Sequence, residues 1–148
     1  MTKLAWFLAT GFGIGYLPMP GTCATLILGL PAAYLWEQCI PKPHLYVCLM
    51  LITLGCIGII HHALRTTTVS HADPPEIVLD EIVAVLWVFA GVPINAQTVA
   101  IGTILFRLLD IIKPFPVSTG EQLPGAYGIV TDDIIAAVIT NIVIRYYT

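Results

Sequence analysis

The strongest constraint on the fold of this chain is a series of apolar runs that contain almost no charge. The clearest run, His44–His62, has no Asp, Glu, Lys or Arg among its nineteen residues. About 20 such residues are enough for a helix to cross a bilayer. Only 10% of the 148 residues are charged, against about 25% in soluble domains. The sequence therefore predicts an all-α, polytopic membrane protein with short loops and a single domain over residues 1–148.

We expect about five hydrophobic helices and one shorter N-terminal helix. The first apolar run, Leu4–Leu17, has about 14 residues, too few to span a bilayer, and is expected to form an interfacial or re-entrant helix. We expect it to be retained, because no small-x-small cleavage site follows it. The third run is short, so its helix should begin before the acidic pair that precedes it. The five longer runs are 22–40, with Thr22 as a helix cap, then 44–62, 82–94, 95–112 and 134–147.

The fourth run ends in an unusual group of charges. Arg107, Asp110 and Lys113 follow one another at intervals of three residues, which places them along one side of a helix. Pro114 prevents the helix from continuing far. Charge beside a membrane span is costly unless it is paired or used. The simplest interpretation is an Arg–Asp pair at the helix end with the lysine reaching the lipid headgroups.

Counting membrane crossings gathers the polar residues at one face. Each span reverses the direction of the chain, so the start of the first span, the ends of the second and fourth, and the starts of the third and fifth share one side. That side would receive Gly21–Thr22, His61–His62, Asp80–Glu81, the charged group 107–113 and Asp132–Asp133. It would also carry three basic residues against two at the other face, Lys42 and Arg145. The positive-inside rule then favours the cytoplasm for it.

Converging carboxylates suit a hard metal ion. Like charges in a medium of low dielectric repel each other, and oxygen ligands select Mg²⁺, Mn²⁺ or Ca²⁺ rather than zinc. Two cationic side chains in the same place could hold a phosphoryl group. A helix that begins at Gly21–Thr22 could offer backbone N–H groups to the same anion. The competing interpretation is that the acidic pairs only complement helix dipoles, and that Gly21–Thr22 only cap a helix.

The net charge, the cysteines and the histidines give little further evidence about function. The net charge of −3 argues against a nucleic-acid partner. The four cysteines form no CxxC or Cys/His metal pattern, so packed, reduced thiols are expected. The histidines at positions 61, 62 and 71 could act as acids or bases, but interfacial histidines more often have no catalytic role.

Five segments of the chain form recognisable motifs. They are Gly11-Phe12-Gly13-x-Gly15, Pro18-x-Pro20-Gly21-Thr22, Asp80-Glu81, Phe106-Arg107-x-x-Asp110-x-x-Lys113-Pro114-x-Pro116 and Gly125-x-x-Gly128-Ile129-Val130-x-Asp132-Asp133. Taken together, they resemble the phosphatidylglycerophosphatase A family of bacterial membrane enzymes, in the family's order and over nearly the whole chain. Two departures are Ala24–Thr25, where the family usually has Gly-Ser, and Ala84, where it usually has glycine.

The resemblance implies a Mg²⁺-dependent hydrolase of the bacterial inner membrane. Its substrate would be phosphatidylglycerophosphate, cleaved at the cytoplasmic face to phosphatidylglycerol and phosphate. On this hypothesis Asp80, Asp110 and Asp132 are catalytic, with either a water or an aspartate as nucleophile. Asp80, Glu81, Asp132 and Asp133 hold the metal, whereas Arg107, Lys113, Gly21 and Thr22 bind the phosphate. The alternatives are a small cation- or proton-coupled transporter, or an inactive paralogue of the family. The oligomeric state is not predicted.

Overall fold

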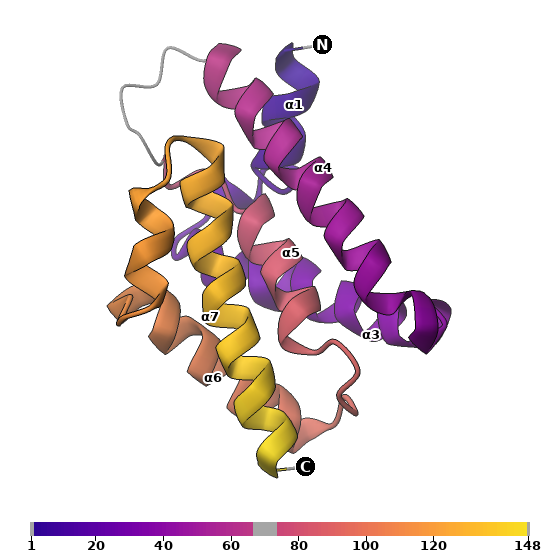
Figure 1. Ribbon diagram of the computed structural model, residues 1–148. Coiled ribbons are helices and arrows are strands. Elements are labelled where there is room, and N and C mark those ends of the chain that lie inside the picture. The colour runs from indigo at the N-terminus through magenta and orange to yellow at the C-terminus, as the bar shows by residue number, and fades with distance from the viewer. Residues whose placement is uncertain (1, 67–73, 148) are drawn as a thin grey trace.

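The computed structural model describes residues 2–66 and 74–147, which are helical with no strand (Figure 1). The all-α expectation is therefore confirmed for these residues. Short 3-10 turns occur at 14–16, 42–44 and 117–122, and a π-helical turn at 25–29. The α-helices are α1 (Thr2–Ala9), α2 (Pro20–Ala24), α3 (Leu30–Cys39), α4 (Leu45–Thr66), α5 (Leu79–Val88), α6 (Ala96–Ile112) and α7 (Ala126–Tyr147).

The first long apolar run forms one continuous helical segment from α2 through the π-helical turn to α3. It begins at Pro20, and Met19 is its N-cap, with no side-chain cap hydrogen bond. Thr22 therefore lies in the first turn, and the expectation that it caps the helix is wrong. Pro31 is accommodated at the start of α3, directly after the π-helical turn. A proline lacks the N–H that a helix interior needs, so a local change of winding at this point is expected.

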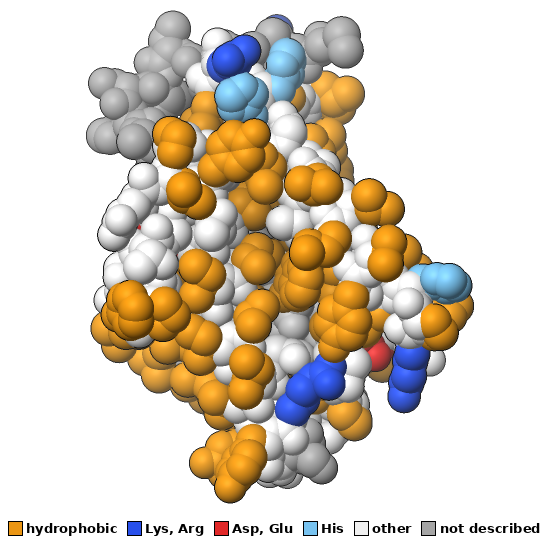
Figure 2. All heavy atoms as spheres, in the orientation of Figure 1, with side chains coloured by type: hydrophobic (Ala, Val, Ile, Leu, Met, Phe, Trp, Pro, Cys, Tyr) orange, Lys and Arg blue, Asp and Glu red, His pale blue; other side chains and the backbone are white. Residues whose placement is uncertain are grey.

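Within the described residues, two helices are long and apolar enough to cross a membrane, by length and composition. They are the segment Lys42–Arg65, which contains most of α4, and α7. Helix α4 packs against α1, and side chains such as Val47, Met50 and Leu54 remain about 60% exposed. Figure 2 shows apolar side chains spread over this face of the molecule. A surface of this kind is suited to contact with lipid.

The short helix α5 lies at the centre of the bundle. Its side chains are apolar on every face apart from the acids of its first turn, and Val83, Ala84, Val85, Leu86 and Val88 are buried. A helix that is apolar all round belongs in a core. It contacts α2, α3, α4 and α7. At ten residues it is about 15 Å long, shorter than the hydrocarbon layer of a bilayer.

The third apolar run therefore does not continue as a helix to Ile94. The backbone leaves the helix after Val88, yet Phe89, Ala90 and Val92 stay buried. Side chains from neighbouring helices satisfy the released backbone groups. Asn141 Nδ2 of α7 donates to the carbonyls of Val88 and Ala90, at 2.9 and 3.1 Å. Non-helical backbone can lie at this depth because protein groups surround it and bind its polar atoms.

Helix α6 agrees closely with its predicted apolar run, whereas α7 begins well before its predicted start. Asn95 caps α6 with a reciprocal pair of hydrogen bonds to Thr98, and α6 ends at Ile112, where the fourth run was predicted to end. Helix α7 begins at Ala126, eight residues before the predicted Ile134. Asp132 and Asp133 therefore lie inside α7, and the expectation that they open it is wrong. All four cysteines are free thiols, but the expectation that they are packed holds fully only for the buried Cys56, and Cys39 is exposed.

Candidate active site

All nine residues proposed from the sequence for the site line one cavity. The cavity has a volume of about 360 Å³ and lies among α2, α5, α6 and α7. Residues 74, 75 and 77, just before α5, complete the wall together with Met19, Ile111 and Ile129. The nine residues are Gly21, Thr22, Asp80, Glu81, Arg107, Asp110, Lys113, Asp132 and Asp133.

The histidines lie elsewhere. His61 is exposed on α4, and His62 lines a separate apolar cavity between α1 and α4. His71 lies outside the described residues. The histidine cluster therefore does not join the carboxylates, as far as the described residues extend.

Helix α5 supplies two carboxylates from its first turn. The N–H of Val78, the N-cap of α5, donates to the carbonyl of Ala9 at 3.0 Å, which fixes the start of α5 against the end of α1. Asp80 is 7% exposed, and the Glu81 side chain is 15% exposed. Acids are favoured at a helix N-terminus by its dipole. The helix dipole and the proposed site therefore both favour acidic residues at the start of α5.

Gly21 is required by the position of Glu81. A Cβ atom on Gly21 would clash with the carboxylate oxygens of Glu81, so a side chain at this position would displace that carboxylate. The carboxylate that lies against the first turn of α2 is thus one of the chain's own. The phosphate-binding role of Gly21 and Thr22 stays a prediction.

Arg107 joins two helices through one nitrogen. Its Nη1 donates to Oε1 of Glu81 at 2.8 Å and to Oδ2 of Asp110 at 2.9 Å. The three side chains are only 13–19% exposed. The i,i+3 pair predicted from the sequence is present, and the additional contact with Glu81 bridges α6 to α5. Because the groups are largely buried, loss of one partner would leave charge in a poorly solvated place.

Lys113 follows the last residue of α6 in a left-handed conformation, with φ of 47°. Its Nζ donates to Oδ2 of Asp132 at 2.6 Å and to Oε1 of Glu121 at 2.7 Å. Burial alone would lower the pKa of this ammonium, but the hydrogen bonds and charges of the two carboxylates raise it above its ordinary value. Lys113 is therefore a stable cation that points inward to α7, rather than out to headgroups.

Helix α7 brings the most deeply buried acids. Asp132 is 4% exposed, and its Oδ1 accepts the N–H of Asp133 at 3.0 Å. Asp133 is 3% exposed, and among the described residues no N–H group or cationic side chain bonds its buried Oδ2, while the carboxyl of Asp110 lies beside it. An ionised carboxylate in such a place costs several kcal/mol unless a cation or donor compensates it. This oxygen is the feature of the site that most clearly needs a cation.

The donor chemistry of the cavity fits a hard cation, although the donors are not gathered at one point. In the described residues, no three Asp, Glu, His or Cys side chains lie close enough together to hold a metal ion. Arg107 and Lys113 are bonded to three of the five carboxylates of the cavity, Glu81, Asp110 and Asp132. With five carboxylates and two cationic side chains, the wall has a formal charge of −3.

Comparison with known proteins identifies the family of this chain. A family model described as phosphatidylglycerophosphatase A matches residues 7–148. The chain belongs to the phosphatidylglycerophosphatase A family. This membership confirms the resemblance that the motifs indicated. Four of the five phosphatidylglycerophosphatase A motif segments contribute residues to the cavity, whereas Gly11-Phe12-Gly13-x-Gly15 does not line it.

Three curated relatives cover most of this chain. A phosphatidylglycerophosphatase A of Haemophilus influenzae is 34% identical over 93% of the chain and 84% of its own length. That of Escherichia coli is 33% identical over 90% of the chain and 77% of its own length. A Bacteroides thetaiotaomicron protein, provisionally named phosphatidylinositol-3-phosphatase, is 31% identical over 93% and 89%. No solved structure matches the chain.

The sequence patterns did not identify Glu121, a charged residue near the cavity, or Asn141, which binds the backbone after α5. Glu121 shares Lys113 with Asp132, but it lies in a turn-rich stretch where an acid gives no signal of its own. Asn141 holds the end of α5 from α7, and a single asparagine in an apolar run likewise has no recognisable pattern.

Proposed function

We propose that this protein hydrolyses the terminal phosphate monoester of phosphatidylglycerophosphate, with Mg²⁺ as cofactor. Membership in the phosphatidylglycerophosphatase A family supports the reaction and the substrate. The observation that carries the proposal is the cavity in which Arg107 and Lys113 meet five carboxylates from three helices. A phosphate monoester needs cationic groups to bind it and a nucleophile to attack it, and this wall offers both.

Arg107 and Lys113 are the proposed phosphate ligands. Each is now bound to two carboxylates at 2.6–2.9 Å, so the incoming phosphate has to replace a carboxylate partner. With a formal charge of −3, the cavity would repel a phosphate dianion. Charge compensation by a cation is therefore a condition for binding. It would also weaken the hold of the carboxylates on Arg107 and Lys113.

The proposed metal ligands are Asp80, Glu81, Asp132 and Asp133. The buried Oδ2 of Asp133 and the all-oxygen donor set support this assignment. When bound, Mg²⁺ would offset the negative charge of the wall and polarise a phosphoryl oxygen.

The remaining catalytic work belongs to the aspartates. Asp80, Asp110 or Asp132 either takes a proton from an attacking water, or attacks phosphorus itself to give an acyl phosphate that water then hydrolyses. Asp110 also orients Arg107 through their 2.9 Å hydrogen bond. Acid quenching of a reaction with ³²P-labelled substrate would separate the two routes. Label that remains on the protein would identify the aspartyl route.

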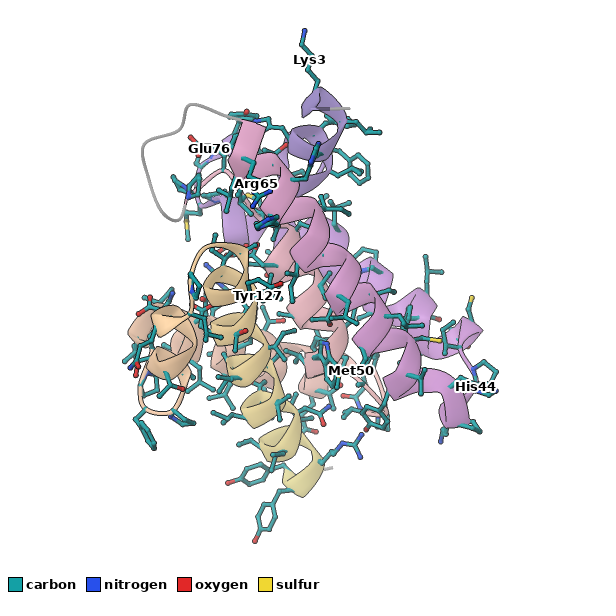
Figure 3. All side chains as sticks on the ribbon, turned by 45° about the horizontal axis from the view of Figure 1, so that its top comes forward. Lys3, His44, Met50, Arg65, Glu76 and Tyr127 are labelled. Atoms are coloured by element: carbon teal, nitrogen blue, oxygen red, sulfur yellow. The ribbon has the colours of Figure 1, made fainter. Side chains whose placement is uncertain are left out.

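We also propose that the bundle is embedded in the bacterial inner membrane, with the cavity at the cytoplasmic face. Its hydrophobic helices would be α2–α3, α4, α5, α6 and α7, with α1 as the short N-terminal helix. The exposed apolar face of α4 supports this placement. Figure 3 shows Lys3 and Arg65 at one end of the α1–α4 pair, with His44 at the other end of α4. Lys3 adds a positive charge to the end that we assign to the cytoplasm.

A panel of single variants tests the site assignment. Phosphate release from phosphatidylglycerophosphate in detergent should fall at least 100-fold in Asp80→Asn, Asp132→Asn and Arg107→Ala. Arg65→Ala, a change of an exposed cation on the same end of the bundle, should remain close to wild type. Near-normal activity in all three site variants would contradict the assignment.

A further inference from the structure

A second, smaller cavity adjoins the first on the other side of Lys113. It has a volume of about 170 Å³, with room for several water molecules. Lys113, Ile129 and Asp132 line both cavities, so the two meet at the proposed phosphate ligand. A group covalently attached to a phosphate held by Lys113 could therefore extend into this second space.

Glu121 is the charged residue that belongs to the second cavity alone. It lies in the 3-10 turn 117–122, which packs directly on α7. A Cβ atom on Gly120 would lie 2.5 Å from the backbone nitrogen of Asp132, so the turn can approach this closely only with glycine there. The position of Glu121 beside Asp132 and Lys113 is thus set by backbone packing.

A carboxylate at this point works against phosphate binding. Oε1 of Glu121 accepts from Nζ of Lys113 at 2.7 Å and so competes with any phosphate for that ammonium. Among the described residues, Oε2 makes no further hydrogen bond, and the side chain is 52% exposed. An ionised carboxylate only accepts hydrogen bonds, so a ligand that profits from Glu121 must bring a donor.

The glycerol headgroup of the proposed substrate brings such a donor. It carries a hydroxyl on the carbon next to the one that bears the terminal phosphate ester. Phosphatidic acid, whose phosphate is attached directly to diacylglycerol, has no hydroxyl there. We propose that Glu121 accepts a hydrogen bond from this headgroup hydroxyl, and that the second cavity selects phosphate monoesters with a neighbouring hydroxyl. The inference rests on the proposed function and specifies which part of the substrate the protein recognises.

Two substrates and three variants test this inference. One substrate is phosphatidylglycerophosphate, and the other is its analogue with propane-1,3-diol in place of the headgroup glycerol, which lacks only the hydroxyl. The variants are Glu121→Ala, Glu121→Gln and the neighbouring control Gln122→Ala, at an exposed position that lines neither cavity. The quantity compared is the ratio of kcat/KM for the two substrates, with Mg²⁺ present.

The wild type should prefer the glycerol substrate by about tenfold or more, the scale of a hydrogen bond to a charged group. Glu121→Ala should lower kcat/KM for the glycerol substrate relative to that for the analogue, and so bring the ratio close to one. Glu121→Gln, which still has an accepting carbonyl, should retain an intermediate ratio. Gln122→Ala should retain the wild-type ratio.

Three results would overturn the inference while leaving the proposed function intact. They are a wild-type ratio of one, an equal loss on both substrates in Glu121→Ala, and no change in that variant. The equal loss would mean that Glu121 only positions Lys113. The absence of phosphate release from either lipid by the wild type would instead overturn the proposed function, and this inference with it.

Discussion

Replacing Arg107 with alanine should affect stability and activity together. One nitrogen of Arg107 holds Glu81 at 2.8 Å and Asp110 at 2.9 Å, and none of the three side chains is more than 19% exposed. Removal of one member of a buried ion pair costs about 3–5 kcal/mol of unfolding free energy, because the remaining charge is poorly solvated. Since these groups keep some contact with solvent, we expect the lower end, about 3 kcal/mol.

A double-variant cycle with Glu81→Gln isolates the interaction. Unfolding free energies would be measured by denaturant titration in detergent micelles at neutral pH for the wild type, both single variants and the double variant. The double variant should be more stable than the sum of the single losses predicts, with a coupling energy of about 1–3 kcal/mol. Arg65→Ala, which changes an exposed arginine, is the control for loss of a positive charge alone.

The same variants separate stability from catalysis. Arg107→Ala should lower kcat for phosphate release by about 10²–10³, the usual loss for one electrostatic contact to the transition state. Single losses that add within about 0.5 kcal/mol would show that the bridge between α6 and α5 is energetically unimportant. That result, together with near-normal turnover, would refute the reasoning.

Three further predictions follow from single residues. Asp133→Asn should abolish phosphate release. In EDTA it should nevertheless raise the unfolding free energy by about 1–3 kcal/mol, because it removes a poorly compensated buried charge. A loss of stability in EDTA would contradict this. Asn141→Leu should lower the unfolding free energy by about 1–3 kcal/mol, since the carbonyl of Val88 loses the Asn141 donor and Arg145 Nε loses its acceptor, while the carbonyl of Ala90 keeps the bond from Arg145. Unchanged stability would show that water replaces the lost partners. Gly21→Ala should lower turnover by displacing the Glu81 carboxylate, and normal turnover would show that α2 can move aside.

The helices could be predicted from the sequence mainly where one apolar run makes one helix. The runs at 44–62 and 95–112 meet this condition, because Pro43 and Pro114 bound them. The start of α7 was misplaced because Gly128 and Thr131 made its first turns look like a loop. The end of α5 was misplaced because Phe89–Ile94 are as apolar as the helix before them. Tertiary hydrogen bonds from α7, which no local pattern reveals, stabilise the non-helical backbone there.

The location of the site was more predictable than its internal contacts. Alternating helix direction was enough to bring Asp80, Arg107 and Asp132 to one place, and the structure gathers them around one cavity. The direction of Lys113 was not predictable, because it depends on a left-handed residue after α6 and on a turn that carries Glu121. Contacts of this kind are set by packing between distant segments rather than by residue spacing.

The most direct test of the central claim is phosphate release by the purified protein in detergent. Phosphatidylglycerophosphate would be supplied with Mg²⁺ or with EDTA, and phosphatidic acid would serve as the comparison substrate. The account predicts release that requires Mg²⁺ and favours phosphatidylglycerophosphate. Equal release in EDTA would contradict the role of the carboxylates as metal ligands. No release under either condition would contradict the proposed reaction itself.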